Sequence, residues 1–152
     1  MNLLQRHNHL NYMNYIDSIN STNINSGYLT IVIGPMFSGK TSHLIHKYNS
    51  ITSIDKQKTI VINHYSDNRY SDKEEIISHD GTSIPCMKIE SLRELYSLFC
   101  NKELHHHDYK YLFINESQFF NDLHLIIIFV EKYKFNVYIY GLDGDFQQKT
   151  FE

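Results

Sequence analysis

A short run of the chain, Gly34-Pro35-Met36-Phe37-Ser38-Gly39-Lys40-Thr41, matches a pattern that binds phosphate groups. Glycine, four residues, glycine, lysine and a hydroxyl residue form the phosphate-binding loop, or P-loop. Gly34 and Gly39 permit backbone shapes and a close approach that side chains would prevent. Lys40 supplies a positive charge for the β- and γ-phosphates, and the hydroxyl of Thr41 is a ligand for Mg²⁺. The motif therefore predicts a nucleotide phosphate site.

The elements that flank the loop agree with this prediction. Leu29–Ile33 is a β-branched, apolar run typical of a buried strand. Lys40–Tyr48 carries Leu44, Ile45 and Tyr48 at helical spacing. The N-terminus of such a helix directs its positive dipole end toward a bound anion. We expect the loop at the junction of a strand and a helix.

Strand patterns alternate with helical patterns along the rest of the chain. Ser91 and Glu94 have the spacing of a capping box, which predicts a helix to about Phe99. A second helical stretch runs from about residue 121 to 134, and strands are predicted at Thr59–Ile62, Tyr109–Ile114 and Val137–Tyr140. Continuous apolar strands separated by helices are typical of a parallel sheet covered on both faces. We predict an α/β fold, a P-loop NTPase (RecA-like) core with a mainly parallel sheet flanked by helices.

Composition limits the class of protein. Asparagine recurs through residues 1–27, so we predict a flexible extension there and one globular core at 28–152. Fourteen basic and seventeen acidic side chains give a net charge of −3, which argues against a polybasic surface for nucleic acid or membranes. No signal peptide or membrane span is evident. Cys86 and Cys100 are too few for a disulfide framework and are expected to be buried thiols in a reducing, cytoplasmic setting.

Further segments make the chain resemble the type II thymidine kinases, the cellular and poxvirus-like class. In the order of that family they are Asp67-Asn68-Arg69-Tyr70, Ser78-His79-Asp80-Gly81, Asn115-Glu116-Ser117-Gln118-Phe119-Phe120 and Gly141-Leu142-Asp143-Gly144-Asp145-Phe146-Gln147-Gln148-Lys149-Thr150-Phe151. With the P-loop, the resemblance extends from about Tyr28 to the last residue. It implies transfer of the γ-phosphoryl group of ATP to the 5′-hydroxyl of thymidine, with Mg²⁺, in nucleotide salvage for DNA synthesis. It also implies a homo-oligomer.

The resemblance implies roles for individual residues. Glu116 matches the catalytic glutamate, and a carboxylate after a strand could accept the proton of an attacking hydroxyl. Arg69 matches an arginine near the phosphates, where its charge would stabilise the transferring group. The apolar walls of the thymidine pocket are implied for Met36, Phe119, Phe146 and Phe151. The implied ATP contacts are Gly34, Pro35, Met36, Phe37, Ser38, Gly39, Lys40, Thr41, Asp67, Asn68, Arg69, Asn115, Ser117 and Gln118, and the implied Mg²⁺ ligands are Thr41 and Asn115.

The chain departs from the family pattern in two places. Asn115 stands where the family has an aspartate, and an amide brings no negative charge to Mg²⁺, so we expect weaker metal binding. The chain stops at Glu152, where the family continues with a zinc-binding segment of paired cysteines and a loop that closes over the base. We therefore expect no zinc site here. For residues 1–152 alone we expect ATP binding, weak thymidine binding and little or no thymidine phosphorylation, because no lid would exclude water.

Two other functions stay open at this point. One is a nucleotide-binding homologue with weak or no activity that serves as a binding partner, which Asn115 and the chain end favour. The other is a P-loop ATPase without a nucleoside acceptor. Intact Lys40 and Glu116 favour a kinase. Adjacent His105, His106 and His107 suggest a metal site, but neighbouring histidines on one loop point in different directions and no further ligand pair accompanies them.

Overall fold

The computed structural model describes residues 27–54, 58–67 and 73–143. The predicted extension before Gly27 and the predicted site residues Asn68, Arg69, Phe146 and Phe151 lie outside the described residues. In chain order, the elements are β1 (Tyr28–Gly34), α2 (Lys40–Ile54), β2 (Lys58–His64), β3 (Glu75–Ile77), β4 (Ser83–Pro85), β5 (Met87–Ile89), α3 (Leu92–Cys100), η1 (His106–Asp108), β6 (Tyr109–Ile114), η2 (Ser117–Phe119), η3 (Leu123–Leu125), η4 (Ile128–Lys132) and β7 (Asn136–Leu142).

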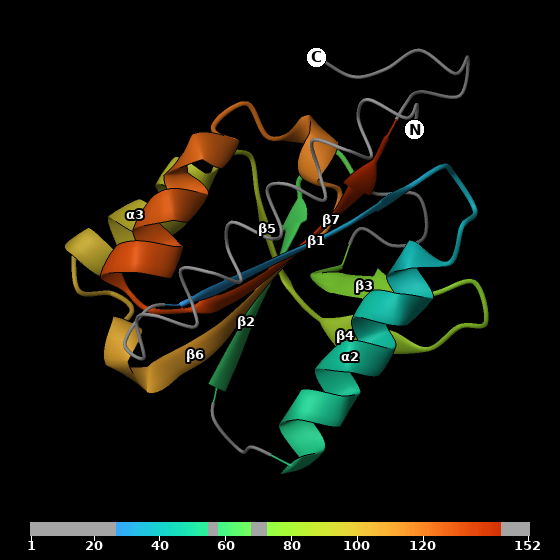
Figure 1. The fold of residues 1–152 in the computed structure, drawn as a ribbon, viewed down its shortest axis with the longest axis horizontal. Coiled ribbons are helices and arrows are strands. Elements are labelled where there is room, and N and C mark those ends of the chain that lie inside the picture. Colours follow the sequence, from blue (N-terminus) through green and yellow to red (C-terminus); the bar gives the residue numbers. More distant parts are fainter. Residues whose placement is uncertain (1–26, 55–57, 68–72, 144–152) are drawn as a thin grey trace.

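Five strands of the described residues form one sheet in the order β1-β7-β6-β2-β5, and each neighbouring pair is parallel (Figure 1). In this register Gly34 at the end of β1 lies opposite Leu142 of β7, and Ile114 at the end of β6 lies opposite Ile139. Parallel strands end at the same edge of a sheet, where ligands of open α/β folds bind. The loops after β1, β6 and β7 therefore meet at one edge. The predicted mainly parallel α/β fold is confirmed.

Both faces of this sheet are covered. Helix α2 and the antiparallel hairpin β3–β4 cover one face, while α3 and the helical turns η3 and η4 cover the other (Figure 1). Side chains along a strand alternate between the two faces. Ile60 and Ile62 accordingly pack with α3, whereas Val61 between them packs with α2. Burial on both faces explains why the strands are mostly apolar along their length and do not alternate strictly between apolar and polar residues.

Helix α3 begins after Ser91, as predicted, but its cap comes from elsewhere. The Ser91 side chain makes no capping hydrogen bond. Instead the carboxylate of Asp122 accepts hydrogen bonds from the backbone N–H groups of Leu92 (3.1 Å) and Arg93 (3.0 Å). A negative charge also complements the positive end of the helix dipole. Asp122 therefore holds η3 against α3, and the predicted serine cap is wrong.

Of two smaller predictions, one holds only approximately and the other is wrong for one of its two residues. The stretch from 121 to 134 is helical but irregular, with a 3₁₀ turn at η3 and a π-helix at η4. Cys100, the last residue of α3, is exposed, so its prediction as a buried thiol is wrong, whereas Cys86 is partly buried. Burial raises the pKa of the Cys86 thiol to about 12.

In the described residues, no helix is both long enough and apolar enough to span a membrane.

Candidate active site

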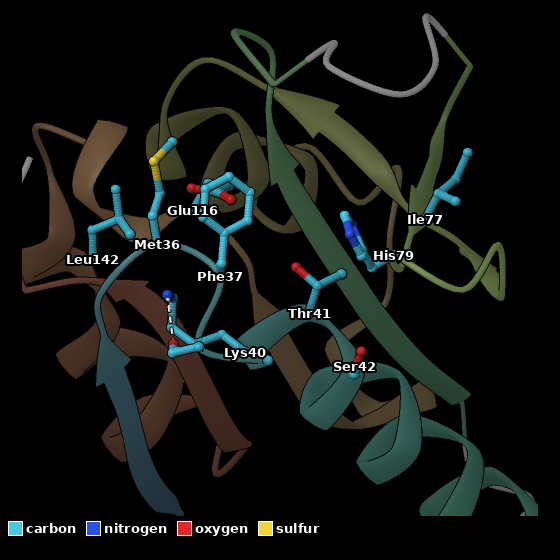
Figure 2. A pocket seen from close by; sticks show the side chains of 11 residues that line it. Met36, Phe37, Lys40, Thr41, Ser42, Ile77, His79, Glu116 and Leu142 are labelled. Atoms are coloured by element: carbon cyan, nitrogen blue, oxygen red, sulfur yellow. Dashed lines mark hydrogen bonds between the residues drawn. The ribbon is translucent and has the colours of Figure 1, made fainter. Parts of the chain in front are cut away.

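A cavity of about 400 Å³ opens at the sheet edge where the loops meet (Figure 2). This volume lies within the range of small-molecule sites. The P-loop and the start of α2 form one side, Glu116 and Leu142 come from the ends of β6 and β7, and the β3–β4 hairpin adds a further side. The lining residues are Met36, Phe37, Ser38, Gly39, Lys40, Thr41, Ser42, Ile77, His79, Glu116 and Leu142.

The P-loop turns through two residues with left-handed backbone. Phe37 has φ +61° and Gly39 has φ +83°. No atom would lie within 4 Å of a Cβ at Gly39, so the backbone angle rather than space favours glycine there. The N–H of His43 donates to the carbonyl of Gly39 (3.0 Å) as α2 begins. The positive end of the α2 dipole therefore opens into the cavity, as an anion site requires.

The ammonium group of Lys40 lies against the P-loop. Its ammonium group donates to the carbonyls of Gly34 (3.0 Å) and Pro35 (2.6 Å) and to Oγ of Ser38 (3.1 Å). A phosphate oxygen entering the cavity would offer this group charge-assisted hydrogen bonds, which are stronger than those to neutral oxygens. The structure thus brings the predicted cation of the P-loop to the cavity together with the N-terminus of α2.

Glu116 places a carboxylate in the same cavity. It follows β6 in a left-handed conformation (φ 52°, ψ 46°) and is 9% exposed. Its Oε2 accepts a hydrogen bond from Nε2 of Gln118, and Oε1 of Gln118 accepts one from the backbone N–H of Leu142 (3.1 Å). Gln118 therefore ties the carboxylate to the end of β7. A backbone conformation that most residues avoid is frequent at functional sites, where the surrounding contacts maintain it.

The turn after Glu116 packs directly on β7. A Cβ added to Gly141 would lie only 2.2 Å from Oγ of Ser117, so any side chain there would force the Ser117 hydroxyl to move. Ser117 is 6% exposed. Neither Ser117 nor Gln118, both predicted ATP contacts, is among the residues that line the cavity. In the described residues both support the position of Glu116.

Asn115 and Asp67, both predicted ATP contacts, are not among the residues that line the cavity. Asn115 is 3% exposed, and its Nδ2 donates to Oδ1 of Asn63 at 3.3 Å. Nδ2 of Asn63 in turn donates to Oδ2 of Asp67 at 3.0 Å. Thr41, the other predicted Mg²⁺ ligand, lines the cavity beside Lys40 (Figure 2). One hydroxyl in a phosphate site fits Mg²⁺, which usually keeps several waters and shares phosphate oxygens with few protein ligands.

Of the predicted thymidine contacts, Met36 lines the cavity and Phe119 does not. Phe119 is 44% exposed, and its ring lies 5.5 Å from that of His64 at the end of β2. The three adjacent histidines lie apart from the cavity, where His106 packs on Tyr133 with ring centroids 4.8 Å apart. Over 27–54, 58–67 and 73–143, no three His, Cys, Asp or Glu side chains gather as a metal site would need.

His79 is a lining residue whose role the sequence did not assign. It lies in the turn between β3 and β4, where the backbone N–H of Thr82 donates to Oδ1 of the Asp80 side chain (3.0 Å). The Ser78 hydroxyl also donates to Asp80 and is the main reason that the pKa of this carboxyl falls to about 2. Short polar residues and Gly81, with φ +86°, are typical of a turn. That signal predicts a turn but not its contact with the P-loop cavity.

Comparison with known proteins gives a family match and several relatives. A family profile described as thymidine kinase matches residues 27–152. The chain is 35% identical over 126 residues to a thymidine kinase of Aster yellows witches'-broom phytoplasma (strain AYWB), covering 82% of this chain and 57% of that protein. It is also 35% identical over 128 residues to a thymidine kinase of Mesomycoplasma hyopneumoniae (strain 7448), covering 82% and 65%. The chain thus spans about 57–65% of the length of these relatives.

Proposed function

The chain belongs to the thymidine kinase family, and on that basis we propose that it acts in transferring the γ-phosphoryl group of ATP to the 5′-hydroxyl of thymidine. One observation carries the proposal beyond family membership. The P-loop, with Lys40 and Thr41, shares a single cavity with the carboxylate of Glu116. A phosphate cradle and a base within one cavity are the parts that phosphoryl transfer to a hydroxyl needs.

In the proposed reaction, backbone N–H groups of the P-loop and the N-terminus of α2 hold the phosphates. Lys40 exchanges its loop acceptors for phosphate oxygens, and the hydroxyl of Thr41 would hold Mg²⁺. When bound, Mg²⁺ neutralises charge that develops on the phosphates. Glu116 accepts the proton of the 5′-hydroxyl, and Gln118 orients that carboxylate. Proton acceptance at Glu116 and charge stabilisation at Lys40 thus occur within one cavity.

The proposed site includes further residues besides Lys40, Thr41 and Glu116. Met36 supports a thymidine site next to the P-loop because it lines the cavity and is 41% exposed. Phe119 is proposed as a second apolar contact, together with Phe146 and Phe151. Arg69 is proposed to stabilise the transferring group. A cytoplasmic location and self-association complete the proposal, and analytical ultracentrifugation tests the latter.

A single-turnover assay tests the function, with the protein in excess over γ-labelled ATP and Mg²⁺ so that even slow transfer is detected. We expect label to appear in thymidine monophosphate only when thymidine is present, and its rate to depend on Mg²⁺. Label released as inorganic phosphate at the same rate with and without thymidine would instead show a P-loop ATPase. ATP that is bound but never cleaved would show a nucleotide-binding homologue.

A further inference from the structure

Two asparagines and an aspartate form a hydrogen-bonded chain beside the cavity. Asn63 lies near the end of β2, and Asn115 follows the neighbouring strand β6; they are 2% and 3% exposed. The backbone N–H of Asn115 donates to the carbonyl of Ile62 (2.9 Å), so the two asparagines lie side by side. Through Asn63, the residue before Glu116 is linked to Asp67, the first residue of the segment at 67–70. Buried amides need such partners because they are shielded from water.

The surroundings determine which way the Asn63 amide points. Its Oδ1 accepts the backbone N–H of His64 at 3.0 Å, and that group can only donate. Its Nδ2 faces the Asp67 carboxylate, which when ionised can only accept. Exchanging the oxygen and nitrogen of this amide would place donor against donor and acceptor against acceptor. Asn115 must therefore present its NH₂ group to Asn63.

An aspartate at position 115 would not fit this arrangement. An ionised carboxylate has no hydrogen to donate, so it would face Oδ1 of Asn63 with a second acceptor. In a buried site, two facing acceptors make no hydrogen bond with each other, and no water takes the place of the missing donor. The asparagine found where the resemblance has an aspartate is thus the residue that matches Asn63.

We propose that Asn63 is a positioning residue of the ATP site, and that Asn63 and Asn115 are a matched pair that holds Asp67 and the start of the Glu116 turn. Neither asparagine lines the cavity, so both act through these neighbours. The link from Asp67 to ATP rests on the proposed function. The pairing itself rests only on the hydrogen bonds and the burial of the two amides.

A double-substitution cycle tests the proposal with Asn115→Asp, Asn63→Lys and both together. A lysine ammonium only donates, so it suits carboxylates at positions 115 and 67 but not the NH₂ group of Asn115. Asn49→Asp, the same change at an exposed position of α2, is the matched control. The readouts are the unfolding temperature and the ATP affinity by calorimetry.

We expect each single substitution to lower the unfolding temperature by about 2–12 °C and to weaken ATP binding. The double substitution should recover at least half of each loss, while Asn49→Asp should change neither. The proposal fails if Asn115→Asp unfolds at the same temperature as Asn49→Asp. It also fails if the unfolding temperatures couple but the ATP affinities do not change, because the pair would then be structural only.

The pairing and the positioning role can still be judged if a variant does not fold or if the chain binds no ATP. If Asn63→Lys does not fold, the comparison of Asn115→Asp with Asn49→Asp still measures the pairing, and the ATP affinity of Asn115→Asp still measures positioning. If the unsubstituted chain binds no ATP, the proposed function and the positioning role both fail. The unfolding temperatures would then still report whether the two amides are paired.

Discussion

Replacing Gly141 with alanine adds one methyl group where β7 packs against the turn that carries Glu116. The new Cβ would lie 2.2 Å from Oγ of Ser117 and 3.2 Å from Oε1 of Gln118. Unstrained contacts are about 3.5 Å or longer, so Ser117 must move by about 1 Å. The described residues with positive φ do not include Gly141. The effect of the substitution is therefore steric and does not come from backbone strain.

The size of the effect follows from this displacement. A catalytic group misplaced by about 1 Å costs about 10²-fold in rate. Overpacking a well-packed site costs about 1–3 kcal/mol of stability, which corresponds to about 2–12 °C in unfolding temperature. We therefore expect phosphoryl transfer to slow about 100-fold. ATP affinity should stay close to that of the unsubstituted chain, because Gly141 is not among the residues lining the P-loop cavity.

Single-turnover transfer, thermal unfolding and calorimetric ATP titration measure the three quantities. Ser117→Ala provides the matched test, because it removes the Oγ and leaves Ser117 Cβ at 3.5 Å, an ordinary contact. The double substitution should recover most of the rate and the unfolding temperature. If Gly141→Ala transfers phosphate at the original rate, or if Ser117→Ala rescues nothing, then this contact does not position Glu116.

Three further predictions concern other parts of the molecule. Glu116→Gln keeps the shape of the base but cannot take a proton, so transfer should fall by about 10²–10⁴-fold with ATP affinity unchanged; full activity would place the base elsewhere. Asp122→Ala removes the cap of α3 and should lower the free energy of unfolding, measured in urea, by about 0.5–2 kcal/mol. An unchanged urea midpoint would show that the cap does not stabilise the fold. Burial raises the pKa of Cys86 to about 12, so its reactive thiolate forms only as the pH rises toward that value. Alkylation at pH 8, followed by mass spectrometry, should therefore label the exposed Cys100 before Cys86. Equal alkylation rates for the two cysteines would contradict this.

The sequence predicted the parts of the fold that have strong local patterns. The strands Tyr28–Gly34 and Tyr109–Ile114 are mostly apolar because α2 covers one face of the sheet and α3 the other. The structure has the P-loop between a strand and a helix, as its local spacing predicted. Phosphate binding there stays a prediction. Glu116 was singled out by the resemblance, and the structure has it shortly after β6, where the strand was predicted to end.

Long-range contacts and very short strands could not be predicted in the same way. Strands β3 and β4 have three residues each, too few to show a periodicity, so the hairpin that brings His79 to the cavity was not predicted. Asp122 caps a helix 30 residues away in sequence, where a local serine had been expected to do so. The pairing of Asn115 with Asn63 spans 52 residues and depends on the register of β2 and β6.

The central claim is that the P-loop cavity binds the phosphates of ATP, and calorimetric titration of Lys40→Ala tests it most directly. Lys47→Ala is the control, because Lys47 is on the same helix but does not line the cavity. Charge-assisted hydrogen bonds contribute about 1.5–3 kcal/mol, so Lys40→Ala should weaken ATP binding about 10- to 100-fold while Lys47→Ala binds as the unsubstituted chain does. Equal ATP affinities for all three proteins would contradict the claim that this cavity is a nucleotide site.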